Sequence, residues 1–128
     1  MAALSLLSIV EIGGYPDFTS LYVSKGFKTE RADSMRKASK LLKKLQPAVV
    51  VAEFNFQSDF RDRTSSLETL MSIVQRIPEC KVIVFYEKDQ RQQLERLLKV
   101  FDIYATISFP IEESMMSDVL DGVLEPFI

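Results

Sequence analysis

Short strand-like runs alternate with segments of helical periodicity, and this alternation is the feature that most constrains the fold. The strand-like runs lie at residues 4–10, 27–30, 48–54, 81–86 and 103–108. The helical segments lie at residues 18–24, 35–45, 67–77, 87–101 and 112–124. Apolar strands linked by helices favour a parallel sheet covered on both faces. The sequence therefore predicts an α/β fold in one domain, residues 1–128, with a doubly wound (βα)5 five-stranded parallel sheet in a three-layer αβα arrangement.

Two helix ends carry local signals. Gly26 follows the helical segment 18–24, where glycine suits the left-handed conformation that closes many helices. Asp33 or Ser34 precedes the segment 35–45, and either side chain can accept a hydrogen bond from the first turn of a helix. These residues predict where the first two helices end and begin.

Composition excludes several classes of function. The 128 residues are 47% apolar and 27% charged, as expected for one soluble globular domain. The sequence contains no histidine, which removes the commonest metal ligand and the usual near-neutral acid or base. Cys80 is the only cysteine, so no intrachain disulfide can form. We therefore expect a cytoplasmic protein with no metal and no cofactor.

Charge and hydropathy limit the partners. The net charge of −2 gives no overall attraction to nucleic acid or to an anionic membrane. No apolar run approaches the roughly 18 residues that a membrane span requires. We therefore expect a protein partner or a second copy of the chain, and neither nucleic acid nor a membrane.

The residues that follow the strands are the first candidates for a site, because open parallel sheets bind ligands outside the carboxyl ends of their strands. Glu11 and Ile12 follow the first strand, and Glu53 ends the strand-like run "PAVVVAEF". Tyr86 ends the fourth strand, and Phe109 follows the fifth. We expect these five residues to lie along one edge of the sheet.

The order of elements and three segments, "PAVVVAEFN", "KVIVFY" and "ISFPIEESMMSDVL", resemble a response-regulator receiver domain of the CheY-like, flavodoxin-like fold. In layout the resemblance covers nearly the whole chain. It implies a role in signal transduction related to two-component phosphorelay. A working receiver has an acidic pair after the first strand, an acceptor aspartate after the third, a serine or threonine after the fourth and a lysine before the proline that follows the fifth.

Carried over by position, the resemblance assigns Glu11 and Ile12 to the acidic pair and Glu53 to the acceptor. Tyr86 takes the place of the hydroxyl residue and Phe109 that of the lysine. Mg²⁺ needs several oxygen ligands in octahedral geometry, and a fixed positive charge stabilises phosphoryl transfer. None of the five family residues is kept, so we expect a degenerate pocket, a pseudo-receiver that is not an enzyme and has no catalytic residue.

The outer faces are the other candidates. Receivers use the face made by the fourth helix, fifth strand and fifth helix for dimerisation and output, and the resemblance places Tyr104 and Phe109 there. Phe60, in the polar loop after the third strand, is a further candidate contact. The sequence equally allows Tyr104 and Phe109 to be core residues. We expect an interaction surface that binds a signalling protein or forms a homodimer.

Two other functions remain open. One is a phosphorylatable receiver that uses a displaced aspartate, Asp59 or Asp62. The other is a flavin or nucleotide binder at the same sheet edge, although the "EIGG" turn matches no phosphate-binding loop.

A basic stripe runs along the helical segment 35–45. Its residues are Arg36, Lys37, Lys40, Lys43 and Lys44. Such a stripe is typical of a solvated helix face, and it can also bind acidic partners.

Overall fold

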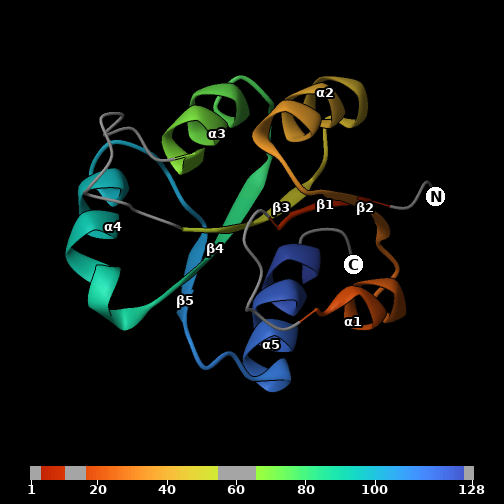
Figure 1. The fold of residues 1–128 in the computed structure, drawn as a ribbon. Coiled ribbons are helices and arrows are strands. Elements are labelled where there is room, and N and C mark those ends of the chain that lie inside the picture. The colour runs from red at the N-terminus through yellow and green to blue at the C-terminus, as the bar shows by residue number, and fades with distance from the viewer. Residues whose placement is uncertain (1–3, 11–16, 55–65, 126–128) are drawn as a thin grey trace.

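The computed structural model describes residues 4–10, 17–54 and 66–125, which form a sheet between two layers of helices (Figure 1). The strands are β1 (Ser5–Ile9), β2 (Lys28–Ala32), β3 (Val49–Glu53), β4 (Lys81–Tyr86) and β5 (Ala105–Ser108). They form a five-stranded sheet in the order β2-β1-β3-β4-β5, and every neighbouring pair is parallel. The predicted fold class is confirmed.

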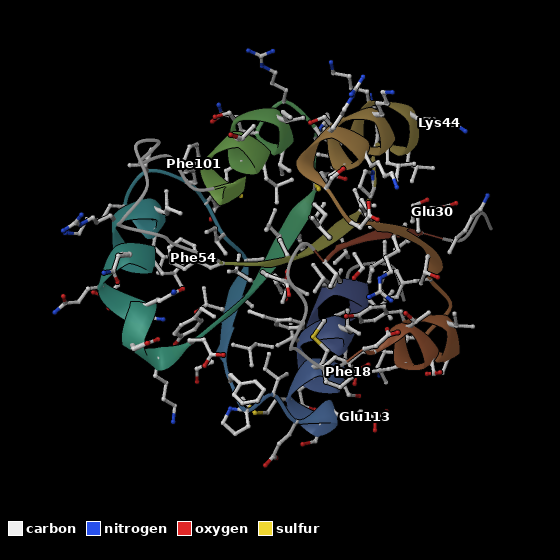
Figure 2. All side chains as sticks on the ribbon, viewed as in Figure 1. Phe18, Glu30, Lys44, Phe54, Phe101 and Glu113 are labelled. Atoms are coloured by element: carbon white, nitrogen blue, oxygen red, sulfur yellow. The ribbon has the colours of Figure 1, made fainter. Side chains whose placement is uncertain are left out.

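Alternate residues of β3 point to opposite faces of the sheet and enter two separate cores. Val50 and Ala52 pack with residues of α2 (Met35–Leu45), α3 (Ser66–Val74) and α4 (Arg91–Leu98). Val49 and Val51 pack with residues of α1 (Thr19–Ser24) and α5 (Glu113–Leu124). Figure 2 shows Phe54 and Phe18 on these two sides of the sheet. Because β3 is central and buried on both faces, a run of small and branched apolar residues is what this position requires.

Local chemistry sets the ends of α1 and α2. Gly26 has φ +91, and the N–H of Phe27 donates to the carbonyl of Tyr22 across 3.1 Å, which is the Schellman arrangement. The Ser34 hydroxyl accepts a hydrogen bond from the Lys37 N–H at 3.2 Å, so Ser34 rather than Asp33 caps α2. Both sequence signals are confirmed.

Several element boundaries differ from the predicted ones by a few residues. The α3 helix ends at Val74 instead of residue 77, because the N–H groups of Arg76 and Ile77 donate to carbonyls three residues back and tighten the chain. A 3-10 turn, Lys88–Gln90, precedes α4, which ends at Leu98. β5 begins at Ala105 rather than at residue 103, and β2 extends to Ala32, two residues beyond its predicted end.

Candidate functional site at the carboxyl edge of the sheet

The strand order reverses between β1 and β3, and this is where doubly wound sheets bind ligands. A small cavity of about 30 Å³ opens there. Its walls come from Ser8, Tyr22, Arg31, Val51, Glu53 and Phe85, among others. A cavity needs roughly 10–15 Å³ of such space to hold one water molecule. The described walls therefore admit a water or a small ion.

Glu53 lines this cavity and is only 6% exposed. It pairs with Phe85 across the β3–β4 ladder, and the next residue, Phe54, donates its N–H to the Phe85 carbonyl at 2.8 Å. Alternation along β3 turns Glu53 to the face covered by α1 and α5, as for Val51. The backbone therefore fixes Glu53 at the predicted edge of the sheet, in a confined environment. A carboxylate buried there requires hydrogen bonds or an opposite charge nearby.

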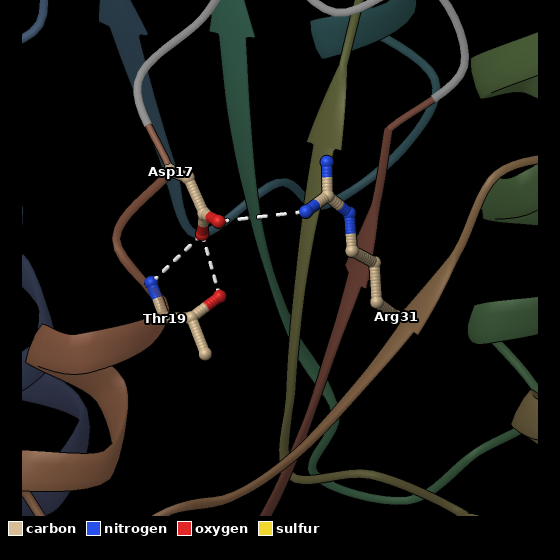
Figure 3. A network of polar contacts seen from close by, with 3 residues as sticks. All are labelled: Asp17, Thr19 and Arg31. Atoms are coloured by element: carbon tan, nitrogen blue, oxygen red, sulfur yellow. Dashed lines mark hydrogen bonds and ion pairs between the residues drawn. The ribbon is translucent and has the colours of Figure 1, made fainter.

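Asp17 and Arg31 form the polar rim of the same cavity (Figure 3). The Asp17 carboxylate accepts hydrogen bonds from the N–H of Thr19 at 3.0 Å and from its hydroxyl at 2.5 Å. Arg31 Nη1 lies 3.4 Å from the other Asp17 oxygen and joins the end of β2 to the start of α1. The hydrogen bond from the Thr19 hydroxyl, then that from the Thr19 N–H and the charge of Arg31, lower the pKa of Asp17. Asp17 is thus held ionised beside Arg31.

Tyr22 completes the described wall on the α1 side. Its side chain is almost fully buried, and burial raises the pKa of its hydroxyl; the negative charge of Asp17 raises it further. Phe18 packs edge-on against Phe85, with ring centroids 6.3 Å apart. The lining of the cavity therefore combines a neutral phenol, the buried Glu53, an exposed ion pair and two aromatic rings.

Sequence reasoning missed Asp17 and Arg31. The signal for Asp17 was the spacing Asp-Phe-Thr before a helix, which forms a turn closed by the carboxylate. Arg31 was missed because the second strand was predicted to end at residue 30. In the sheet Arg31 pairs with Ser8, which brings it to the edge near Glu53.

Tyr86 is held away from this cavity by α4. The Nη1 of Arg91 donates to the Tyr86 hydroxyl at 3.0 Å, and the guanidinium carbon lies 5.3 Å from the centroid of the same ring. Arg91 also contacts the Thr106 hydroxyl of β5 at 3.4 Å. Although Tyr86 ends β4 as predicted, its hydroxyl is directed to α4 and does not line the cavity.

Phe109 follows β5 and is 38% exposed. Its N–H donates to the Tyr86 carbonyl at 2.9 Å, and the peptide bond to Pro110 is cis. Phe109 is not among the residues that line the cavity with Glu53. Of the five residues predicted for this edge, the cavity includes Glu53, while Glu11 and Ile12 lie outside the described residues.

Tyr104 precedes β5 and is 42% exposed. Its N–H donates to the Val82 carbonyl at 3.0 Å, and Lys81 Nζ lies 5.3 Å from the centroid of its ring. Tyr104 and Phe109 are therefore not core residues, and they flank β5 at its opposite ends. Phe60, Asp59 and Asp62 lie outside the described residues.

Within the described part of the chain, no cluster of three or more Asp, Glu, Cys or His side chains is arranged to hold a metal ion. No helix in the same part is long and apolar enough to cross a membrane.

Comparisons with known proteins define the fold. No protein-family model matches the sequence, and no curated protein matches it. Solved structures do match: a response regulator receiver domain protein from Clostridium thermocellum has a TM-score of 0.74 at 14% identity, over 97% of this chain and 96% of that one. The receiver domain of NtrC4 from Aquifex aeolicus has a TM-score of 0.72 at 14% identity, over 98% and 99% of the two chains. A response regulator from Desulfuromonas acetoxidans has a TM-score of 0.70 at 15% identity, over 98% of this chain and 99% of that one.

These matches assign the chain to the CheY-like fold, which response-regulator receiver domains share. At such low identity the similarity concerns the fold alone and does not define the chemistry at the carboxyl edge of the sheet.

Proposed function

We propose that the chain is a pseudo-receiver: a cytoplasmic protein-interaction module of signal transduction that does not accept a phosphoryl group at Glu53. The proposal rests on how three residues are arranged at the carboxyl edge of the sheet. Glu53 is buried beside a cavity of about 30 Å³, while Tyr86 is bound to Arg91 and Phe109 is an apolar residue outside the cavity. Solved receiver structures with the same fold support the signalling role.

Phosphoryl transfer depends on groups placed to stabilise negative charge as it develops. At the lysine position Phe109 supplies no positive charge. Glutamate also extends the carboxylate by one methylene relative to aspartate, and small errors of placement are costly to catalysis. Arg31 is engaged with Asp17, at 3.4 Å. The residues at this edge are therefore suited to a fixed polar site and not to catalysis of phosphoryl transfer. The chain is accordingly proposed to have no enzymatic activity.

The surface proposed for the partner flanks β5, the edge strand. Tyr104 and Phe109 are 42% and 38% exposed, and exposed aromatic side chains are frequent anchors at protein interfaces. Val100, which lines a cavity together with Tyr104, and Met115 in α5 are also exposed apolar residues. A signalling protein or a second copy of the chain would bury these side chains.

Incubation with acetyl phosphate and Mg²⁺, followed by intact and peptide mass spectrometry, tests the absence of phosphorylation. We expect no added phosphoryl group, with a phosphorylatable receiver domain as the positive control. A stable adduct on Glu53 would contradict the proposal. An adduct on Asp59 or Asp62 would favour a receiver that uses a displaced aspartate.

A thermal shift assay with FMN and nucleotides tests the small-ligand alternative. The described cavity, at about 30 Å³, is far smaller than the few hundred Å³ of a typical small-molecule site. We therefore expect no stabilisation by either ligand. A ligand that binds only the folded state would raise the melting temperature, and this would count against a bare interaction module.

A further inference from the structure

Two helices of this chain carry opposite charge. Residues 35–45, which form α2, contain five cationic side chains and no Asp or Glu: Arg36, Lys37, Lys40, Lys43 and Lys44. Residues 112–125, which span α5 and its two caps, contain five carboxylates and no Lys or Arg: Glu112, Glu113, Asp118, Asp121 and Glu125. All ten side chains are exposed. The charges of the two segments cancel in the total, so the net charge of −2 conceals a strong separation of positive and negative charge.

The fold places these two faces on opposite sides of the molecule. The α2 helix packs on one face of the sheet and α5 on the other (Figure 1). Figure 2 shows Lys44 at the outer side of α2 and Glu113 at the outer side of α5, with the sheet between the two helices. Because the faces point away from each other, they cannot neutralise each other within one copy.

Little of this charge is neutralised locally. Lys37 pairs with Asp33 at 3.0 Å, and Asp121 pairs with Lys25 at 2.6 Å while remaining 61% exposed. Among the described residues, the other charged side chains of these two faces form no salt bridge. Each face is therefore a largely uncompensated patch of one sign.

The spacing of the charges on the two helices also matches. Arg36, Lys40 and Lys43 lie at intervals of four and three residues along one stripe of α2. Asp118, Asp121 and Glu125 lie at intervals of three and four along one stripe of α5. At a rise of about 1.5 Å per residue, antiparallel helices would oppose Arg36 to Glu125, Lys40 to Asp121 and Lys43 to Asp118. The antiparallel arrangement also opposes the two helix dipoles favourably.

We propose that the basic face of α2 docks on the acidic face of α5 of a second copy of this chain. Each copy offers one face of each sign, so the contact is heterologous and can add further copies head to tail. The contact uses the charged side chains of α2 and α5 and not the exposed aromatic residues Tyr104 and Phe109, and it does not depend on the proposed function. Because the pairs are exposed, the association is weak and falls steeply with salt.

Charge reversal with matched controls tests the contact. The first variant carries Lys40→Glu and Lys43→Glu, the second carries Asp118→Lys and Glu125→Lys, and the third carries all four substitutions. Arg96→Glu with Lys99→Glu matches the first variant in net charge on the exposed surface near α4, and Glu87→Lys with Asp89→Lys matches the second. Sedimentation velocity measures association in about 10 mM salt, where the Debye length is about 30 Å, and in about 1 M salt, where it is about 3 Å.

We expect the wild type to associate in a concentration-dependent manner in low salt and to be monomeric in high salt. The first and second variants alone should lose at least about tenfold in affinity, and mixing them should restore association. The third variant, in which both faces are reversed, should associate as the wild type does. The α4-region controls and Tyr104→Ala should leave the low-salt association in place.

Three results would overturn the proposal. One is a wild type that stays monomeric in low salt up to about 1 mM protein. Another is a loss of association in the matched controls as large as in the first two variants. The third is a failure of the mixture and of the fully reversed variant to recover association. None of these outcomes depends on whether Glu53 is phosphorylated or on which protein binds near Tyr104, so the two proposals fail independently.

Discussion

The Nη1 atom of Arg91 lies 3.0 Å from the Tyr86 hydroxyl oxygen, and its guanidinium carbon lies 5.3 Å from the centroid of the Tyr86 ring. The same side chain contacts Thr106 at 3.4 Å and Glu95 at 3.1 Å. One residue of α4 thus joins the carboxyl end of β4 to β5. Tyr86, at the carboxyl end of β4, is in this way a structural contact.

We predict that Arg91 and Tyr86 are energetically coupled. Arg91→Ala should lower the free energy of unfolding by about 1 kcal/mol, because it removes a hydrogen bond and a cation–π contact at a partly buried site. In a Tyr86→Leu background the same substitution should cost at least about 0.5 kcal/mol less. Urea denaturation measures all four proteins, and Lys99→Ala serves as the uncoupled control. Additive effects would show that the contact contributes nothing measurable.

The loop after α1 allows a test of backbone strain without side-chain contacts. Gly26 has φ +91, and a Cβ built on it meets no atom within 4 Å. Gly26→Ala should therefore destabilise the fold by about 1 kcal/mol through its backbone conformation alone. Gly26→Asn should cost less, since asparagine tolerates the left-handed region. Equal losses for alanine and asparagine in urea denaturation would contradict this explanation.

Gly122, inside α5, presents the opposite case. Its backbone is helical, but a Cβ there would lie 2.7 Å from the Tyr104 hydroxyl oxygen. Alanine in a helix interior is favoured over glycine by about 1 kcal/mol. We predict that Gly122→Ala stabilises the Tyr104→Ala variant by close to this amount and the wild type by clearly less, because the tyrosine ring must move. The same gain in both backgrounds, measured by urea denaturation, would mean that Tyr104 does not rest on Gly122.

The sequence predicted the architecture because each element carries its own local signal. The β-branched run at residues 48–54 identifies a buried central strand, and Gly26 and Ser34 identify helix ends. The ends of α3 and α4 were overestimated because apolar spacing continues through Ile77 and Phe101 after the helical hydrogen bonds have given way to tighter turns. Periodicity reports which side chains face the core, and it does not report the hydrogen-bonding pattern of the last turn.

The site was predicted less completely, because its members meet only through topology. Glu53 was expected at the edge from strand position alone, and it lies there. Arg31 and Asp17 belong to different elements, and their approach depends on the pairing of β1 with β2 and on the turn closed by Thr19. The direction of the Tyr86 side chain depends on Arg91, and strand position cannot reveal it.

Under the proposed function, the carboxyl edge of the sheet should not accept a phosphoryl group even when Glu53 is replaced by aspartate. Glu53→Asp supplies the acceptor residue that receiver domains use, yet Phe109, which stands where the resemblance places a lysine, supplies no charge to a transferring phosphoryl group. We therefore predict that the single variant gains no phosphoryl group from acetyl phosphate and Mg²⁺ in intact mass spectrometry. The wild type is the negative control. Labelling of the single variant would show that the extra methylene of Glu53 alone blocks the chemistry.

Cys80 should react slowly at neutral pH. Burial raises the pKa of its thiol to about 11. Only the thiolate reacts with alkylating agents, and an ordinary cysteine has a pKa of about 8.5. The rate of alkylation by iodoacetamide should therefore keep rising about tenfold per pH unit well above pH 8.5, where a normal thiol levels off. At pH 8 the folded chain should react at least about tenfold more slowly than the chain in denaturant.

The dependence of the alkylation rate on pH above 8.5 distinguishes a raised pKa of the Cys80 thiol from poor access of the reagent to it. Because the pKa of Cys80 is raised, the folded state favours the neutral thiol. The stability that the buried thiol contributes is complete below about pH 8.5 and is lost as pH rises toward about 11. Cys80→Ala removes this contribution and should flatten the fall in stability between pH 8 and pH 10, measured by urea denaturation at each pH. If the alkylation rate instead levelled off near pH 8.5 at a low value, access would limit the reaction, and the pKa would be normal.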